Sequence, residues 1–274
     1  MIDRILLPLD GSDAAEAVFT YGELLAERFG SDIIIFQACI PEYRLARKMH
    51  QLYIQKTSEL MQRRLKDSCP EGKRPQVHAE FVSGEFANSI RQFVKTHNIS
   101  LVIMADHGFT SCRIRPVGSV VDKIFRLLDC PTMLVRTCGP YQISDKEKII
   151  GRILLPLDGS KNSEKAIPIV QDLALKLKSE VILFMMVQKD SVQEKEATKY
   201  LKGIGSTLQR LGINVRWQVV VGEDKAKEII EAGKKVLSDL IVMATLGRSL
   251  VDTWAPKSVA RKLLNTGDRP LLIV

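Results

Sequence analysis

Short apolar runs alternate along the chain with segments whose apolar residues recur every three or four positions. The runs at residues 5–9 and 33–36 contain no charged residue, which is typical of strands buried on both faces of a parallel sheet. Further strands are predicted at residues 77–82, 101–104 and 132–135, and helices at about 15–26, 43–66 and 85–96, with another from residue 118. Strand and helix therefore alternate through the first half of the chain.

The second half of the chain repeats the first. Residues 4–12 read RILLPLDGS, and the same nine letters return at residues 152–160, an offset of 148. Shorter parallels follow in the same order down to the last predicted strand of each copy. We therefore predict two tandem domains, at residues 1–140 and 150–274, with a polar linker at 139–150.

The alternation of strands and helices with short connections predicts the α/β class, with a doubly wound, Rossmann-like parallel sheet in each domain. A length of 274 residues suits two such domains, each large enough for its own core. In the second copy, Pro168 lies about one turn into the first predicted helix, where we expect it to remove one backbone hydrogen bond and to bend the helix.

Composition and charge narrow the class of protein. The net charge is +8, but lysines are scattered among acids and aromatic residues make up only 6%, so nucleic-acid binding is not favoured. No apolar run approaches the roughly 20 residues that cross a bilayer, and the first strand begins too early to leave room for a signal peptide. Five cysteines without a C-x-x-C pair favour a reducing cytoplasm, and no His/Cys cluster indicates a metal site.

Candidate chemistry lies where two predicted strands end. Ligands of doubly wound sheets bind beyond the carboxyl ends of the strands. Asp10 follows the first strand, and Gly118 and Ser119 begin a helix after the fourth. A helix that starts with glycine suits a phosphate, although Ser119 could instead cap the helix with Asp122 as its capping-box partner. Asp10 could likewise serve only to turn the chain and cap the next helix.

The spacing of these residues resembles that of nucleotide-binding universal stress proteins. Their pattern is P-x-D-G-S after strand one and G-x-x-G, nine residues, then G-S after strand four. The first copy reads Ala105-x-x-Gly108, nine residues, then Gly118-Ser119, with alanine in place of the first glycine. The resemblance implies two domains of the adenine-nucleotide alpha-hydrolase type that bind ATP or a related adenine nucleotide, with Mg²⁺ as an optional companion.

The resemblance also implies which residues of the first copy contact the nucleotide. They all follow the carboxyl ends of predicted strands or begin the helix after strand four. Adenine or ribose would meet Pro8, Leu9 and Asp10, the base pocket would include Ala38, ribose and phosphates would meet Met104, Ala105, His107 and Gly108, and the phosphates would meet Gly118, Ser119 and Val120. No catalytic residue is carried over.

The second copy departs further from the pattern. It reads Ala244-x-x-Gly247, nine residues, then Lys257-Ser258, so that a lysine crowds the phosphate position. Either this copy has lost its nucleotide, which we favour, or the cations Lys257, Arg261 and Lys262 near a helix N-terminus indicate a bound anion. The residues of this degenerate second site are Asp158, Met186, Ala244, Gly247, Lys257 and Ser258.

Three functions remain open at this point. The first is a nucleotide-binding stress or regulatory protein, and the second is an interaction scaffold that binds no nucleotide. The third is an enzyme, which we do not favour because the chain has neither the P-loop G-x-x-x-x-G-K nor an H-x-G-H signature; ATP hydrolysis, if any, should be slow. Family members commonly pair through their last strands, so we expect residues 132–135 and 271–274 to pair as an intramolecular pseudo-dimer, which could dimerise again.

Overall fold

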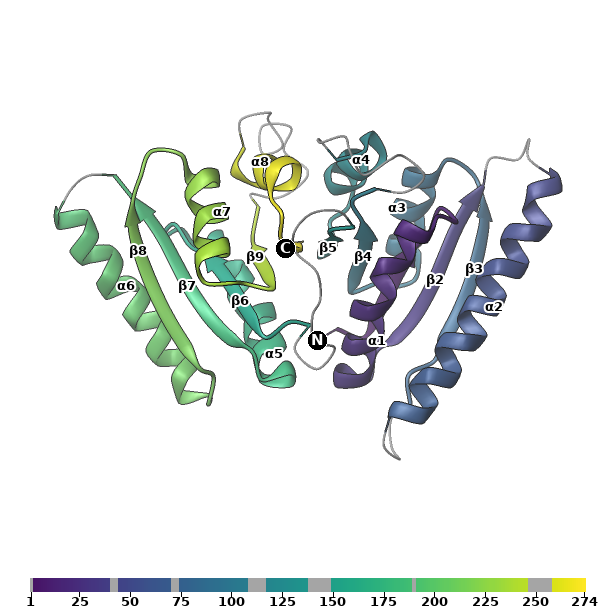
Figure 1. Cartoon of the computed structure of the whole chain (residues 1–274), viewed down its shortest axis with the longest axis horizontal. Helices are drawn as coiled ribbons and strands as arrows, with labels where there is room; N and C mark the ends of the chain where they lie inside the picture. Colours follow the sequence, from purple (N-terminus) through teal and green to yellow (C-terminus); the bar gives the residue numbers. More distant parts are fainter. Residues whose placement is uncertain are drawn as a thin grey trace. The chain divides into compact units, whose positions relative to one another are not determined.

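A computed structural model describes residues 2–39, 44–69, 74–107, 117–137, 149–188, 191–245 and 258–274. The chain divides into two compact units, Met1–Cys138 and Gly139–Val274. Figure 1 labels most of the helices and strands of both units and colours them along the chain.

Unit 1 is built around a parallel sheet of five strands in the order β3-β2-β1-β4-β5. The strands are β1 (Arg4–Pro8), β2 (Asp32–Cys39), β3 (Val77–Ser83), β4 (Leu101–Ala105) and β5 (Thr132–Val135). The helices are α1 (Val18–Phe29), α2 (Arg44–Ser68), α3 (Phe86–Thr96) and α4 (Ser119–Leu127). Strand order reverses between β1 and β4, which places the switch point of the sheet at the ends of these two strands.

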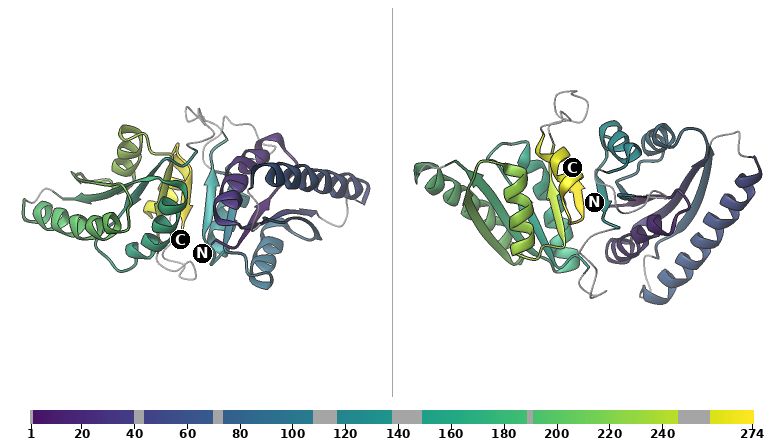
Figure 2. Two further views of the ribbon diagram at one scale, coloured as in Figure 1. Left: turned by 90° about the horizontal axis from the view of Figure 1, so that it is seen from below. Right: turned by 45° about the horizontal axis from the view of Figure 1, so that its top comes forward.

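Unit 2 has the same topology, with the sheet order β10-β9-β6-β7-β8. Its strands are β6 (Arg152–Pro156), β7 (Glu180–Val187), β8 (Val215–Val221), β9 (Leu240–Met243) and β10 (Leu271–Ile273). Its helices are α5 (Ile167–Leu177), α6 (Ser191–Arg210), α7 (Lys225–Lys235) and α8 (Val259–Thr266). In each unit helices cover both faces of the sheet (Figure 2). The predicted doubly wound α/β fold is confirmed, whereas pairing through the last strands stays a prediction.

The central strands are apolar because both of their faces are covered. In β1, Ile5, Leu6 and Leu7 are fully buried, as are Ile153 and Leu154 of β6. The outer strands β3 and β8 are less buried along their length, which matches their position at a sheet edge. The apolar runs of the sequence thus mark the strands in the middle of each sheet.

The expected bend at Pro168 is wrong. A 3₁₀ turn, Ser163–Ala166, precedes α5, and α5 itself begins at Ile167. Pro168 therefore lies in the first turn of the helix, where a backbone N–H has no intrahelical partner in any case. In unit 1, a 3₁₀ turn (Asp13–Ala17) likewise precedes the first α-helix, α1.

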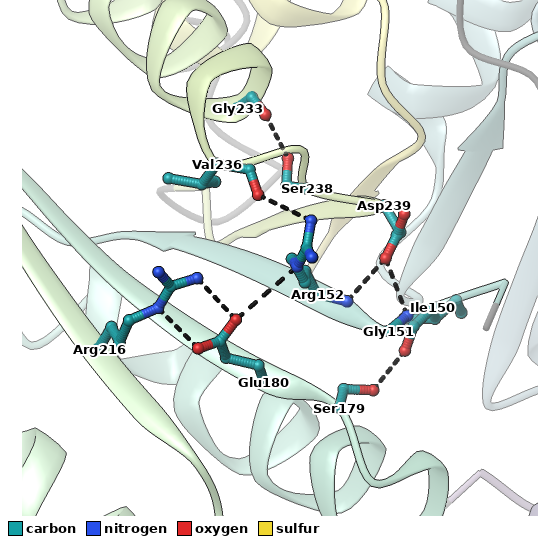
Figure 3. A network of polar contacts seen from close by, with 10 residues as sticks. All are labelled: Ile150, Gly151, Arg152, Ser179, Glu180, Arg216, Gly233, Val236, Ser238 and Asp239. Carbon is teal, nitrogen blue, oxygen red and sulfur yellow. Dashed lines mark hydrogen bonds and ion pairs between the residues drawn. The ribbon is translucent and has the colours of Figure 1, made fainter.

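In both units, one side chain joins the amino ends of the two central strands by accepting hydrogen bonds from two backbone N–H groups. In unit 1 the backbone N–H groups of residues 3–4 donate to Ser100 Oγ, both at 2.9 Å. In unit 2 those of residues 151–152 donate to one carboxylate oxygen of Asp239, at 2.9 and 2.7 Å (Figure 3). These bonds fix β1 beside β4 and β6 beside β9, so that the carboxyl ends of the paired strands also lie together.

Candidate functional site

A tight turn follows β1 and holds Asp10 at the edge of the sheet. Asp10 Oδ1 accepts hydrogen bonds from the backbone N–H of Ser12 at 2.9 Å and from its hydroxyl at 2.6 Å. Gly11 has φ +90°, a conformation that glycine adopts without strain. Ser12 Oγ in turn accepts from the N–H of Ala15 at 3.2 Å and caps the following 3₁₀ turn. Asp10 therefore holds the turn, as considered, whereas the cap is made by Ser12; contact of Asp10 with a nucleotide stays a prediction.

Unit 2 repeats this turn with Asp158. Its Oδ1 accepts from the N–H and hydroxyl of Ser160 at 3.0 and 2.6 Å. Partial burial would raise the pKa of Asp158, but the hydrogen bonds from Ser160 and Ser163, together with the charge of Lys225, lower it below its ordinary value. The carboxylate is thus a stable anion that holds the turn together.

The other predicted residues of unit 1 lie at the same edge of the sheet where they are described. Ala38 is near the end of β2, and Met104 and Ala105 end β4, which pairs with β1 in parallel. Ala38 and Ala105 are half-buried, whereas Met104, Pro8 and Leu9 are buried. Parallel pairing therefore brings the three strand ends together, as the position of a ligand at the switch point requires. Gly108 lies outside the described residues.

His107 belongs to a buried polar cluster that sequence reasoning missed. Its Nδ1 lies 3.2 Å from Asp106 Oδ1, and both side chains are more than nine-tenths buried. The same Asp106 oxygen accepts from the backbone N–H and hydroxyl of Thr137 at 2.9 and 2.7 Å, and Arg136 Nη1 lies 3.6 Å from the other. Thr245 replaces Asp106 in the second copy, and this difference between the copies is the sequence signal that could have pointed to the cluster. The cluster joins the ends of β4 and β5.

No described side chain caps the start of helix α4. Gly118 is the N-cap residue, and no described side chain accepts a hydrogen bond from the first turn. A Cβ atom built on Gly118 would meet no described atom within 4 Å, and both Ser119 and Val120 are exposed. The capping box considered for Ser119 is therefore wrong, because Ser119 is the first helical residue. Among the described residues, no side chain competes with an anion for the backbone N–H groups of this first turn.

The equivalent helix of unit 2 caps itself. Ser258 is the N-cap of α8, and its Oγ accepts from the N–H of Arg261 at 3.3 Å. Lys262 Nζ lies 2.9 Å from a carboxylate oxygen of Asp224, so an acid of the protein already faces this cation. Lys262 therefore needs no bound anion to balance its charge. Gly247 and Lys257 lie outside the described residues.

A small cavity lies at the carboxyl ends of the unit 2 strands. Its described lining includes Asp158, Met186 and Ala244 of the predicted second site, and its volume is about 120 Å³. Small-molecule pockets usually begin at roughly 300 Å³. Met186 occupies the position of Ala38 of unit 1 and brings a larger side chain to the cavity wall. As described, this cavity is too small for a nucleotide.

Two tyrosines that sequence reasoning missed brace the turn after the first strand of each unit. Tyr53 of α2 donates to Glu16 Oε1 at 2.6 Å, and Tyr200 of α6 donates to Glu164 Oε1 at 2.8 Å. Burial and then the adjacent carboxylate raise the pKa of each tyrosine well above its ordinary value. The recurrence of the Tyr/Glu pair in both copies was the signal that could have found it.

The described part of the chain has neither a metal-binding cluster nor a membrane-spanning helix. Among the residues that the structure describes, no group of three or more His, Cys, Asp or Glu side chains could hold a metal ion. In the same residues, no helix combines the length and apolar character needed to span a membrane.

Comparison with known proteins identifies the family. The family model described as the universal stress protein family matches residues 1–136 and again residues 150–274. The chain belongs to the universal stress protein family. Its two copies are tandem repeats of the family domain, as the resemblance implied. A universal stress protein of Methanocaldococcus jannaschii is 24% identical over 167 residues, which cover 56% of this chain and 95% of that protein. One of Synechocystis is 29% identical over 133 residues, with coverage of 44% and 83%.

Solved structures confirm the fold of this universal stress protein over its whole length. The crystal structure of a universal stress protein from Archaeoglobus fulgidus has a TM-score of 0.75 at 16% identity and covers 100% of this chain and 98% of its own. The cytoplasmic domain of a prokaryotic cation chloride cotransporter has a TM-score of 0.59 at 15% identity, with coverage of 100% and 95%. At such identities the likeness concerns the fold alone, and the ligand must be argued from the site.

Proposed function

We propose that this tandem universal stress protein binds ATP or a related adenine nucleotide in its N-terminal domain and acts in stress response or regulation. The observation that carries the proposal is the first turn of α4, which begins at Gly118, is capped by no described side chain and has no described atom within 4 Å of a Cβ at Gly118. Backbone N–H groups and the helix dipole at such a turn favour a phosphate. The thiols of the five cysteines would stay reduced in the cytoplasm, where we place the protein.

The rest of the nucleotide would extend from α4 along the strand ends. Met104 and Ala105 lie at the end of β4, next to the turn of Asp10 that follows β1. The ribose would therefore lie between the end of β4 and the Asp10 turn. Ala38 at the end of β2 leaves room for the base because its side chain is small. Asp10 Oδ2, which accepts no hydrogen bond from a described residue, would accept one from a ribose hydroxyl while Oδ1 holds the turn.

We propose that unit 2 does not hold a nucleotide. Its helix α8 uses Ser258 as its own cap, and Met186 narrows a cavity of about 120 Å³. The second domain would then act as the partner half of the first. Any Mg²⁺ would have to enter with the nucleotide, since Asp10 is the only carboxylate among the predicted contacts in unit 1.

Isothermal titration calorimetry with ATP tests the proposal. Gly118→Lys introduces the residue found in the second copy, and a side chain over the first turn should abolish binding. Gly203→Lys is the matched control, because a Cβ built on Gly203 of α6 also meets no described atom within 4 Å. We expect the wild type and Gly203→Lys to bind one ATP and Gly118→Lys to bind none.

Two outcomes would contradict the proposal. Unchanged affinity in Gly118→Lys would mean that the phosphates lie elsewhere. No binding by the wild-type protein would favour an interaction scaffold, a function compatible with the internal hydrogen bonds already made by Asp10 and with the burial of His107 beside Asp106.

A further inference from the structure

A second cavity in unit 2 lies at the opposite end of the strands from the candidate nucleotide site. Its volume is about 470 Å³, and its described lining includes Arg152, Ile182, Arg216, Lys235 and Leu237. Arg152 is the first residue of β6, and Lys235 is the last residue of α7. This amino-end pocket falls in the size range of roughly 300–1,000 Å³ that is usual for small-molecule sites.

Both arginines of the amino-end pocket are held in place by one acid, Glu180. Arg216 Nε and Nη2 lie 2.6 and 2.7 Å from the two carboxylate oxygens of Glu180, a two-pronged pair (Figure 3). Arg152 Nε lies 3.8 Å from the same carboxylate, and its Nη1 donates to the carbonyl of Val236 at 3.3 Å. The guanidinium groups on two strands are therefore positioned before any ligand arrives.

The pocket carries more positive than negative charge. Arg152, Arg216 and Lys235 contribute three cations, and Glu180 contributes one carboxylate. Within the described residues Lys235 makes no ion pair, whereas its neighbour Lys234 pairs with Glu231 at 3.2 Å. Neither Glu180 nor Asp239 lines the pocket; Glu180 is counted because it pairs with both arginines, whereas the carboxylate of Asp239 accepts from backbone N–H groups (Figure 3). An excess of two positive charges suits a dianion.

The walls add an apolar component. Ile182 and Leu237 both line the pocket; Ile182 is buried, and Leu237 has 60% of its surface exposed. We propose that the amino-end pocket binds a small organic phosphomonoester, with the phosphate on Arg152, Arg216 and Lys235 and the organic part against Ile182 and Leu237. A phosphomonoester carries a charge of about −1.5 to −2 at neutral pH, and guanidinium groups match its oxygens in pairs.

The first copy supports a site specific to unit 2. In unit 2, Arg216 of β8 pairs with Ile182 of β7. At the equivalent position of unit 1, His78 of β3 pairs with Ile34 of β2. The last residue of α3, which corresponds to Lys235, is Thr96. Two of the three cations are therefore missing from the described unit 1. The proposal is independent of nucleotide binding, because it concerns the other end of the strands.

Calorimetric titration of the full chain with phenyl phosphate tests the proposal. The titration is made in a Gly118→Lys background, so that the proposed nucleotide site does not contribute. We expect one phenyl phosphate to bind, Lys235→Thr to weaken binding by about tenfold, and Lys234→Thr to change it little. Arg216→His, the residue of the first copy, should weaken binding as well. Inorganic phosphate should bind more weakly than phenyl phosphate, because it leaves the apolar wall empty.

Three results would overturn the proposal. One is the absence of phenyl phosphate binding, which would leave the arginines with the structural task of joining β6, β7 and β8. Another is equal weakening by Lys235→Thr and Lys234→Thr, which would indicate a general charge effect. The third is binding of vesicles that contain phosphatidic acid, lost in Lys235→Thr, without binding of phenyl phosphate, which would assign the pocket to a lipid headgroup.

Discussion

Replacing the serine at the start of the last helix should reduce stability in unit 2 and ATP affinity in unit 1. Ser258 uses its hydroxyl to cap α8, whereas Ser119 is exposed at the first position of an uncapped helix. Ser258→Ala should therefore reduce stability and leave ATP affinity unchanged. Ser119→Ala should reduce ATP affinity and leave stability unchanged, because its hydroxyl would serve the phosphate.

The structure sets the size of both effects. An N-cap serine is worth about 0.5–2 kcal/mol, and the 3.3 Å distance from Ser258 Oγ to the Arg261 nitrogen favours the lower half of that range. A loss of about 1 kcal/mol should lower the melting temperature of unit 2 by roughly 3 °C. A hydrogen bond to a charged group contributes about 1.5 kcal/mol, so Ser119→Ala should raise the Kd for ATP roughly tenfold.

Differential scanning calorimetry and ATP titration of both variants measure these effects. Comparison without nucleotide is essential, because bound ATP would itself raise the melting temperature. The reasoning is refuted if Ser119→Ala destabilises the protein as much as Ser258→Ala does, or if it leaves ATP affinity unchanged.

Further predictions concern the turn and the core. Tyr53→Phe should lower the free energy of unfolding by about 1 kcal/mol in denaturant titrations, since it removes the bond to Glu16; no loss would mean that this bond is not stabilising. The folded pKa of Asp158 is lowered, so its contribution to stability is present above the unfolded pKa of about 3.9 and is lost as pH falls through the folded pKa. Asp158→Asn should flatten this acid dependence, and an unchanged pH profile would contradict the shift. Leu154→Ala, at a fully buried position of β6, should cost about 2–5 kcal/mol, and a loss below 1 kcal/mol would contradict its tight packing.

Sequence patterns predicted the fold because its determinants are local or repeated. The apolar run at residues 5–9 has no polar alternation because β1 is covered on both faces. The same run returns at residues 153–157, so β6 is also predicted to be a strand covered on both faces. The start of α5 was misplaced because periodicity alone does not separate a 3₁₀ turn from the helix that follows it.

The polar contacts of the sites were less accessible to sequence reasoning. Asp106 meets Thr137 only because β4 pairs with β5, and Tyr53 meets Glu16 only because α2 packs near the first turn. The amino-end pocket combines side chains from β6, β8 and the end of α7. Such constellations depend on the packing of elements far apart in the chain, which spacing within the sequence does not encode. By contrast, comparison of the two copies in the sequence does show that Gly118 of the first copy is replaced by Lys257 in the second.

A crystal structure of the full chain grown with excess ATP tests the central claim most directly. The account predicts nucleotide in unit 1, with its phosphates against the backbone N–H groups of Ser119 and Val120, and none at the carboxyl ends of the unit 2 strands. ATP bound only in unit 2, or in unit 1 with its phosphates away from α4, would contradict it.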